Sequence, residues 1–580
     1  MRPRSNDPDV RFTEDLVPVS DRFGDVYFSA EDGLAETRAV FLDGCGLPEA
    51  WAGRRRFTVA ELGFGTGLNI AALLTLWAGT RPPGARLHVF TVEAYPMSRD
   101  QASAALGRWP EVAAAAAALT AGWPSAGRGF HRLDLPEFGA VVDVAVMEAV
   151  EALESWQGKA DAWFLDGFSP ASNPEMWRDE VLAGVRARSA PRARVATFTV
   201  AGEVRRRLSA LGFTVGKRPG FGRKRERLEA LLPGPVADAA APGRVAIVGG
   251  GVAGASLARA LRAESVEALL VEAEAPGAGA SGNPAALVTP RFDAGGGPQA
   301  ELFAQAFERA VALYEREAPD AVIARGALQL EAGERDAGRF DRIVGQPLWA
   351  EGALERLPGQ GMAIRDGLTV EPAAALSAFL GDTPMIRAAV ARIEAAPDGW
   401  RLIDADGRTI AVAGAVALAA GWGLAGLRPD LPLRPARGQA SFVTSAERPA
   451  AAAWGGYVIP TRDGFLFGAT FDRGDAGVER RAEDDARNLA TLAERRPALA
   501  ASVGKVEGRA RVRATTPDHL PACGELEPGL WVLGGLGSRG FTTAPLLAEH
   551  LAARLAGEPS PLPARLAALL EPGRFETASA

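Results

Sequence analysis

The chain has 580 residues, of which 47% are hydrophobic and 23% are charged, the composition of an ordinary globular protein of roughly two to four domains. Its formal net charge of −7 argues against indiscriminate binding of nucleic acid. Two cysteines far apart in the sequence and four histidines without ligand spacing give no sign of a disulfide framework or a metal site.

The N-terminus is polar and lacks the apolar stretch of a signal peptide. No run of residues approaches the roughly 18 apolar residues of a membrane-spanning helix. We therefore expect a cytoplasmic protein with no membrane partner and no metal.

The first glycine-rich loop follows an apolar strand that ends at Glu61. Gly63, Gly65 and Gly67 come next, and a helix is expected over 68–76. The acid precedes the glycines and the last two glycines are only two residues apart, unlike a dinucleotide fingerprint. This arrangement suits S-adenosylmethionine, which has no phosphate, because the backbone can approach its amino-acid part and the acid can meet its ammonium group.

Two further strands end in acids. The strand over 87–93 ends at Glu93, where a carboxylate can accept ribose hydroxyls, and the strand over 142–148 ends at Glu148, which can accept the adenine amino group. Taken singly, each acid is better explained as a surface carboxylate that binds no ligand. Three acids at successive strand ends, together with the glycines, indicate a site for a nucleoside cofactor.

The next strand, over 162–165, brings Asp166 to the carboxyl edge of the sheet, where open α/β folds bind ligands. A carboxylate beside an amine can accept its hydrogen bond or its proton, so Asp166 is the candidate catalytic residue for methylating an amine. Phe168 and Trp177 are expected to wall a flat base. The alternative is that Asp166 and the glycine after it form only a turn.

A basic run follows, with 13 Lys and Arg against 2 Asp and Glu over 186–227, a local balance of +11. It contains Arg223, Lys224 and Arg225. Such a run is either a solvated face or a contact with nucleic acid. The turn-rich stretch over 236–243 is expected to be a linker, which ends a first domain at residue 235.

The second half opens with a strand over 245–248, the glycines Gly249, Gly251 and Gly254, and a helical pattern. In a dinucleotide site these glycines allow a tight turn, close approach to the pyrophosphate and close packing of helix on strand. The pyrophosphate would lie on the N-terminus of the helix. The alternative is an ordinary glycine-rich turn.

The strand over 268–272 ends at Glu272, about 20 residues past the glycines, where an acid that binds the ribose is expected. Ser281 lies in a loop that can reach the flavin end of the cofactor. Residues from roughly 320 to 510 alternate short strands and turns, as in a substrate domain inserted into the cofactor domain. The pattern of the cofactor domain returns near the C-terminus, where a strand leads to Gly535, Gly537 and Gly540 before a helix over 544–555.

The expected fold is therefore α/β throughout. A Rossmann-like S-adenosylmethionine methyltransferase domain over 1–235 precedes a Rossmann-like FAD domain over 244–580, into which an α+β substrate domain is inserted.

Nearly the whole chain resembles the MnmC family, the bifunctional proteins of tRNA 5-methylaminomethyl-2-thiouridine biosynthesis. The resemblance depends on motifs in both halves. They are Asp25-Val-Tyr-Phe-Ser, Glu36-Thr-Arg38, the glycine loop through Asn69, Asp161 to Phe168, Asn173-Pro and Gly220-Phe-Gly-Arg-Lys-Arg225, followed by the dinucleotide glycines, Gly279 to Asn283, Arg437-Gly-Gln439, Gly468-Ala-Thr-Phe-Asp472, Asp518-His-Leu-Pro521 and Ser538-Arg-Gly540. Glu148 departs from the family pattern, in which an Asp is expected, but either carboxylate can accept from adenine.

The resemblance implies two reactions on the wobble uridine of certain tRNAs, with tRNA as partner and with FAD and S-adenosylmethionine as cofactors. The C-terminal half is similar to D-amino-acid and glycine oxidases and would remove the carboxymethyl group from 5-carboxymethylaminomethyl-uridine. The N-terminal half would then methylate the remaining amine.

Arg513 stands where glycine-oxidase-like enzymes place an arginine for the substrate carboxylate, and Arg539 is the second candidate. A structural ion pair is the alternative for Arg513. Two other functions stay open for the whole chain: a free amine or amino-acid oxidase fused to an unrelated methyltransferase, and a tRNA-binding scaffold without catalysis. Protein partners cannot be inferred.

Overall fold

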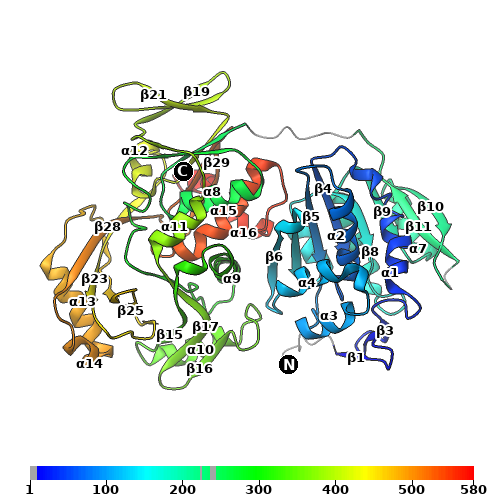
Figure 1. The fold of residues 1–580 in the computed structure, drawn as a ribbon, viewed down its shortest axis with the longest axis horizontal. Coiled ribbons are helices and arrows are strands. Elements are labelled where there is room, and N and C mark those ends of the chain that lie inside the picture. The colour runs from blue at the N-terminus through cyan, green and yellow to red at the C-terminus, as the bar shows by residue number, and fades with distance from the viewer. Residues whose placement is uncertain (1–8, 223–224, 236–242, 580) are drawn as a thin grey trace. The chain divides into compact units, whose positions relative to one another are not determined.

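A computed structural model describes residues 9–222, 225–235 and 243–579. The chain folds into two compact units, Met1–Ala239 and Ala240–Ala580 (Figure 1). Most of the stretch expected to be a linker, residues 236–242, lies outside the described residues, as do Arg223 and Lys224.

The first unit is built on an eight-stranded sheet in the order β10-β11-β9-β8-β4-β5-β7-β6. The strands at its centre are parallel, while β6, β10 and β11 pair antiparallel with their neighbours. Their bounds are β4 Arg56–Leu62, β5 Arg86–Val92, β6 Gly129–Leu135, β7 Ala140–Val146, β8 Ala160–Leu165, β9 Ser189–Thr197, β10 Thr214–Pro219 and β11 Glu226–Leu231. Parallel order places the carboxyl ends of β4, β5, β7 and β8 along one edge.

Helices cover both faces of this sheet because its central strands are apolar on both sides. Val59 faces one core, which α2 and α4 complete, and the adjacent Ala60 faces a second core with α5, α6 and α7. The helices are α2 Leu68–Thr80, α3 Arg99–Leu106, α4 Ala113–Ala121, α5 Ala149–Ser155, α6 Asp179–Ala187 and α7 Gly202–Ala210. The result is a three-layer α/β unit, which agrees with the Rossmann-like α/β domain expected from the sequence.

An N-terminal segment precedes this sheet. It forms a small sheet of β1 Val10–Phe12, β2 Pro18–Ser20 and β3 Asp25–Val26, followed by α1 Gly33–Thr37 and a π-helical turn, η1 Arg38–Leu42. Phe28, Leu34 and Phe41 are buried in the same core as α2. The segment is thus part of the unit and can contribute to its ligand site.

The second unit contains the six-stranded cofactor sheet, in the order β18-β13-β12-β22-β30-β29. All pairs are parallel except β29 with β30. The strands are β12 Val245–Val248, β13 Ala268–Glu272, β18 Met385–Arg387, β22 Ala415–Leu418, β29 Ala522–Glu527 and β30 Leu530–Gly534. The helices α8 Val252–Ala263, α9 Pro298–Glu317 and α15 Gly540–Ala556 share a core with one face. A three-stranded sheet of β19 Arg392–Ala396, β20 Gly399–Ile403 and β21 Thr409–Ala413 shares a core with the other.

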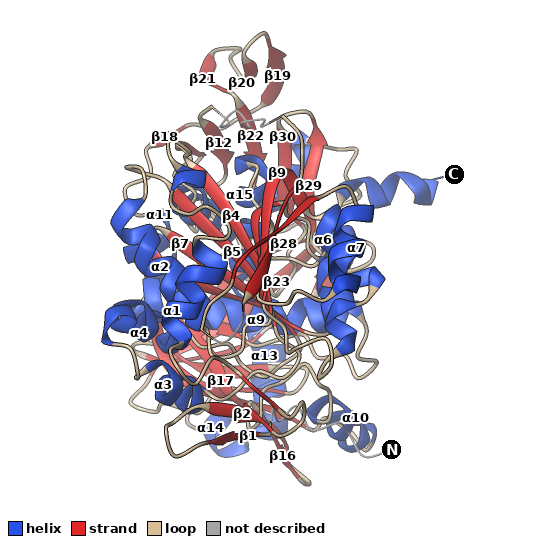
Figure 2. Ribbon diagram, turned by 90° about the vertical axis from the view of Figure 1, so that its right-hand side faces the viewer, coloured by secondary structure: helices blue, strands red, loops and turns tan. Residues whose placement is uncertain are grey.

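A ten-stranded sheet forms the substrate part of this unit. Its path runs β14-β17-β15-β24-β25-β26-β23-β27, with β16 on β17 and β28 on β23. Figure 2 shows the two long strands β23 and β28 side by side, as their nine-residue register requires. The strands are β14 Ala286–Val288, β15 Val322–Leu330, β16 Leu354–Leu357, β17 Gly361–Val370, β23 Arg434–Thr444, β24 Ala452–Ala453, β25 Tyr457–Pro460, β26 Gly464–Gly468, β27 Asp472–Arg473 and β28 Glu507–Thr515, with helices α10 Arg335–Val344, α11 Pro372–Leu380, α13 Ala482–Arg495 and α14 Pro497–Ala501.

The substrate part is not one continuous insertion over 320–510. β18 and β22 lie within that range but pair in the cofactor sheet, while β14 lies before it and pairs in the substrate sheet. The chain therefore passes between the two sheets several times, which places the cofactor loops and the ends of the substrate strands around one cavity.

Two candidate active sites

The glycine loop of the first unit has the backbone that its sequence requires. Gly63 has a φ of +99°, and a Cβ there would lie 2.4 Å from the carbonyl oxygen of Asp166. Gly67, with a φ of +76°, is the N-cap of α2. Only glycine fits both positions without strain, so the loop can pass close to a bound cofactor.

Glu93 and Glu148 both line the cavity beside this loop, as expected for a nucleoside site. Glu93 accepts hydrogen bonds from the backbone N–H of Gly65 and of Tyr95, each at 3.0 Å, and its burial raises the pKa of its carboxyl. Glu148 is exposed and stands at the start of α5. These acids fit the ribose and adenine of S-adenosylmethionine.

Glu61 lies behind the cavity rather than on its wall. It is 1% exposed and accepts hydrogen bonds from Asn69 Nδ2 at 3.0 Å and from Thr91 Oγ1 at 2.8 Å. Burial, with the nearby Asp166 carboxylate adding to it, raises the pKa of Glu61 to about 8. From the sequence, Glu61 was expected to bind the ammonium group of the cofactor. In the structure its two carboxylate oxygens instead accept hydrogen bonds from neighbouring side chains.

Asp166 lines the cavity, and the structure adds two residues that hold it. Asn69 Nδ2 donates to Asp166 Oδ2 at 2.6 Å, and Thr37 Oγ1 donates to Asn69 Oδ1 at 2.7 Å. The Asn69 amide therefore bridges the carboxylates of Glu61 and Asp166 while its oxygen is fixed by the N-terminal segment. Asn69 and Thr37 belong to two motifs of the family resemblance, but neither was predicted as a site residue.

Aromatic rings form part of the wall of this cavity, whose volume is about 1050 Å³. Phe168 packs on Phe23 and on Tyr27, with ring centroids 4.8 and 5.2 Å apart. Trp177 does not line the cavity. It is 3% exposed in the core under α6, and its Nε1 donates to the carbonyl of Phe168 at 2.9 Å. Its role is thus to support Phe168 from behind.

The described part of the basic run over 186–227 includes β9, α7 and β10 and reaches the start of β11. Part of its charge is neutralised locally by ion pairs: Arg207 with Asp179 and Glu203, Lys217 with Glu226, and Arg227 with Glu229. Arg225 is exposed, and its neighbours Arg223 and Lys224 lie outside the described residues.

In the second unit, the dinucleotide loop joins β12 to α8. Gly249 has a φ of +106°, and a Cβ at Gly254 would lie 1.9 Å from the carbonyl oxygen of Gly249, so both must be glycine. Glu272 accepts from the backbone N–H of Gly250 at 2.5 Å, and Ser281 Oγ accepts from the N–H of Val252 at 3.0 Å. Gly249, Gly251, Glu272 and Ser281 line one cavity of about 930 Å³, which fits the nucleotide of FAD at the N-terminus of α8.

Arg513 and Arg539 line the same cavity, as do the C-terminal glycines Gly535, Gly537 and Gly540. Arg513 Nη1 donates to the carbonyl of Thr470 at 3.3 Å, and Arg539 Nη1 donates to Thr289 Oγ1 at 2.8 Å. Neither guanidinium forms an ion pair with any residue of the described ranges. Burial lowers the pKa of both groups.

The structural ion pair considered for Arg513 is thus absent among the described residues. Removing two guanidinium groups from water without a carboxylate partner costs free energy unless an anion binds beside them. Tyr457, on β25, lines the same cavity beside Arg513 and was not predicted; burial raises the pKa of its phenol.

No group of three or more His, Cys, Asp and Glu side chains within 9–222, 225–235 and 243–579 is arranged to hold a metal ion. Across the same ranges no helix has the length and the apolar character needed to cross a membrane.

Comparison with known proteins agrees with the two units. Residues 110–233 match the family model of S-adenosyl-L-methionine-dependent methyltransferases, and residues 244–554 match that of FAD dependent oxidoreductases. Glycine oxidase from Geobacillus kaustophilus is similar in structure, with a TM-score of 0.47 and 24% identity over 55% of this chain and 95% of the oxidase.

Full-length relatives share both halves in the same order. The tRNA 5-methylaminomethyl-2-thiouridine biosynthesis bifunctional protein MnmC of Caulobacter vibrioides is 57% identical, over 100% of this chain and 99% of the relative. The protein of the same name from Maricaulis maris is 44% identical, over 96% of this chain and 94% of the relative. The chain is a bifunctional enzyme with a methyltransferase and an FAD-dependent oxidoreductase domain, and it belongs to the MnmC family.

Proposed function

We propose that this chain performs two successive reactions on the wobble uridine of tRNA. Residues 244–580 remove the carboxymethyl group from 5-carboxymethylaminomethyl-(2-thio)uridine, and residues 1–235 methylate the amine that remains. The names of the full-length relatives support the tRNA substrate. We place the reactions in the cytoplasm.

The observation that carries the first reaction is the pair Arg513 and Arg539, which line the FAD cavity without an ion pair to any residue in the described ranges. The substrate bears a secondary amine next to a carboxylate, and a guanidinium fork can bind both carboxylate oxygens. FAD, when bound, supplies the oxidation of the carbon–nitrogen bond. Gly249, Gly251, Glu272 and Ser281 hold its nucleotide, while the two arginines orient the carbon to be oxidised. Water then hydrolyses the resulting imine, which releases the two carbons of the carboxymethyl group as glyoxylate and leaves an aminomethyl group on the base.

In the second reaction, Asp166 prepares the aminomethyl nitrogen. S-adenosylmethionine, when bound, supplies the methyl group, and the nitrogen must present its lone pair to it. Asp166, held by Asn69 at 2.6 Å, orients the amine and accepts the proton that the amine releases. Phe168 lies against the base, and Glu93 and Glu148 bind the nucleoside of the methyl donor.

The basic run over 186–227, which includes Arg223, Lys224 and Arg225, is proposed as a contact with the tRNA backbone. Affinity for tRNA is then expected to fall steeply as salt rises, because each neutralised phosphate releases counterions.

The experiment is to incubate the purified protein with carboxymethylaminomethyl-tRNA, with and without S-adenosylmethionine, and to analyse the nucleosides by mass. A flavin absorbance spectrum, aminomethyl product without the methyl donor and methylaminomethyl product with it are expected. A flavin spectrum with unchanged tRNA would instead favour the free amine oxidase.

A further inference from the structure

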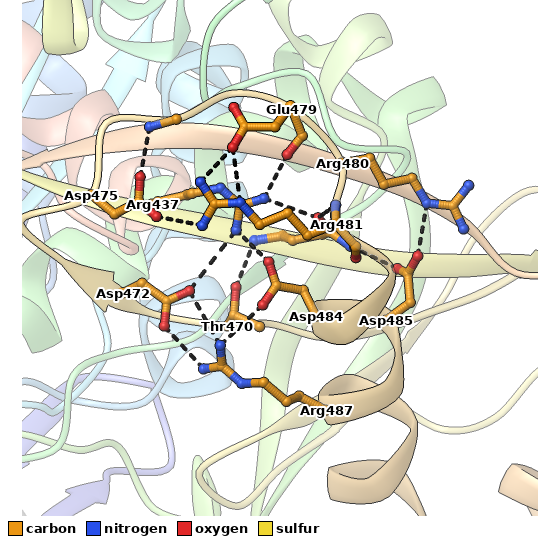
Figure 3. A network of polar contacts seen from close by, with 12 residues as sticks. Arg437, Thr470, Asp472, Asp475, Glu479, Arg480, Arg481, Asp484, Asp485 and Arg487 are labelled. Atoms are coloured by element: carbon orange, nitrogen blue, oxygen red, sulfur yellow. Dashed lines mark hydrogen bonds and ion pairs between the residues drawn. The ribbon is translucent and has the colours of Figure 1, made fainter.

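Two motifs of the oxidase unit have no role in the chemistry described above: Arg437-Gly-Gln439 on β23 and Gly468-Ala-Thr-Phe-Asp472 after β26. The structure brings them together (Figure 3), and Ala469, Thr470 and Phe471 of the second motif line the flavin cavity. The segment over 470–481, here called the platform loop, begins in the second motif and is fastened by the first.

The platform loop is tied at both ends to β23. The backbone N–H of Gln439 donates to Thr470 Oγ1 at 2.9 Å, and the N–H of Thr470 donates to the carbonyl of Gln439 at 3.1 Å. At the other end, Gln439 Nε2 donates to the carbonyl of Arg481 at 2.7 Å and its Oε1 accepts from the Arg481 N–H at 2.8 Å. One buried glutamine therefore fixes both ends of the loop.

A buried guanidinium strengthens this attachment. Arg437 is 0% exposed, donates to the carbonyl of Glu479 at 2.6 Å and forms an ion pair with Asp484, which is 2% exposed (Figure 3). Within the loop, Arg481 bonds Asp475 at 2.6 Å. A loop held at its ends and its middle keeps one shape, so side chains on its surface stand in fixed positions.

Two of the exposed side chains on this loop are large and apolar. Phe471 is 42% exposed and Val478 is 55% exposed, and both line the flavin cavity. The ring of Phe471 lies 5.6 Å from the Cζ of Arg513. A Cβ on Gly438, between the two anchoring residues, would lie 2.0 Å from Arg513 Nη1, so this glycine leaves the space that the guanidinium occupies. One motif thus places both the loop and the arginine.

The spacing suits the substrate of the proposed function. Four single bonds of about 1.5 Å join the carboxylate carbon to the base, a reach of about 5 Å when extended. The Phe471 ring lies 5.6 Å from Arg513 Cζ, so a linker of this length can carry the base from a carboxylate beside the guanidinium to the ring. A carboxylate held at Arg513 therefore leaves the base within reach of Phe471.

We propose that Phe471, supported by Val478, is the stacking platform on which the nucleobase of the RNA substrate lies during oxidation. The proposal rests on the tRNA substrate of the proposed function and adds the residue that selects a base-bearing amine over a small amino acid. Aromatic side chains stack on any base and do so without hydrogen-bond readout.

The test compares Phe471→Leu with Phe471→Tyr in the full-length flavoprotein. Leucine has a similar bulk and covers Arg513 but has no π face, whereas tyrosine keeps the ring. We expect kcat/KM for oxidation of carboxymethylaminomethyl-tRNA to fall about 10- to 100-fold in Phe471→Leu and to stay within about threefold in Phe471→Tyr. Val478→Ala is expected to lower it less than Phe471→Leu.

Flavin absorbance and thermal melting report whether each variant is folded. Val412→Ala is the matched control, since Val412 is 52% exposed on β21 in the same unit and does not line the cavity. Equal kcat/KM for Phe471→Leu and the parent protein would overturn the proposal that Phe471 stacks on the base. Equal losses of kcat/KM in the leucine and tyrosine variants would overturn it as well. A parent protein that leaves the tRNA unoxidised would instead overturn the proposed function on which it rests.

Discussion

The two cavities differ in the sign of the charge that they present. In the first unit, seven carboxylates line the cavity against two arginines, and Glu93, Glu148 and Asp166 surround the glycine loop. In the second unit, three arginines line the cavity against Glu272 and Glu274, and Arg513 and Arg539 form no ion pair with other residues of the described ranges.

This difference matches the charge of the two substrates. A substrate that still has its carboxymethyl group carries a carboxylate next to the reacting amine, so arginines bind that group and a carboxylate-lined cavity disfavours it. Once that group is removed, the amine suits a site with an acid beside it. The charge of each cavity thus favours oxidation before methylation.

The largest expected effect comes from removing the acid of the methyltransferase site. Asp166→Asn keeps the size of the side chain but cannot take the proton of the amine, so we expect methylation to slow by about 10²- to 10⁴-fold. Aminomethyl-tRNA should accumulate because oxidation continues. Nucleoside mass analysis measures both products, and binding of S-adenosylmethionine checks that the cofactor site is intact. An unchanged methylation rate would remove Asp166 from the mechanism.

The reciprocal change is made in the oxidase site. Arg513→Lys keeps the positive charge but loses the planar fork that binds both carboxylate oxygens. We expect oxidation to fall roughly a hundred-fold while flavin absorbance stays, since a hydrogen bond to a charged group contributes about 1.5–3 kcal/mol. Methylation of aminomethyl-tRNA by the same variant is the internal control. Full oxidative turnover by the lysine variant would show that the fork is not needed.

These two residues also show what could be predicted from the sequence. The limits of β12 and β13 were predicted correctly because buried parallel strands are continuous apolar runs, which end at Gly249 in the first case and at the acid Glu272 in the second. Asp166 and the glycines were found because they lie in local motifs, and Arg513 because the resemblance to glycine-oxidase-like enzymes implies an arginine there. Asp166, Arg513 and the predicted glycines other than Gly67 and Gly254 line the two cavities.

The remaining site residues depend on contacts between distant parts of the chain. Thr37 and Asp166 meet Asn69 across 32 and 97 residues, and no local pattern marks such contacts. Trp177 was expected on a cavity wall because an aromatic residue near a site fits a wall or the core beneath it equally well in sequence. The order of strands in the substrate sheet could not be predicted because several neighbours, such as β14 with β17 and β15 with β24, are far apart in the chain.

A smaller effect is expected from Asn69, and a second variant distinguishes it from the effect of another hydrogen bond in the same network. Asn69→Ala removes the bond at 2.6 Å that fixes the Asp166 carboxylate, while Thr91→Val removes a bond to Glu61 and leaves Asp166 untouched. We expect methylation at saturating S-adenosylmethionine to fall about tenfold in Asn69→Ala, the cost of one charge-assisted hydrogen bond, and only slightly in Thr91→Val. Equal losses in the two variants would mean that Asn69 acts through Glu61 and not through Asp166.

The smallest expected effect is on stability and comes from the acid behind the same cavity. Burial and the charge of Asp166 raise the pKa of Glu61 to about 8, so its protonated form is favoured in the folded state. The stability that this group contributes is complete below the pKa of a free carboxyl and is lost as the pH rises through about 8.

In Glu61→Gln the amide oxygen can still accept the hydrogen bond from Asn69, and the side chain has no group that ionises. We therefore expect the melting temperature of the methyltransferase unit to fall by a few degrees more between pH 6 and pH 9 in the parent protein than in Glu61→Gln, as measured by calorimetry of the full chain. Melting curves that shift equally with pH in both proteins would show that Glu61 is already ionised in the folded state at pH 6, and would leave Asn69 between two charged carboxylates.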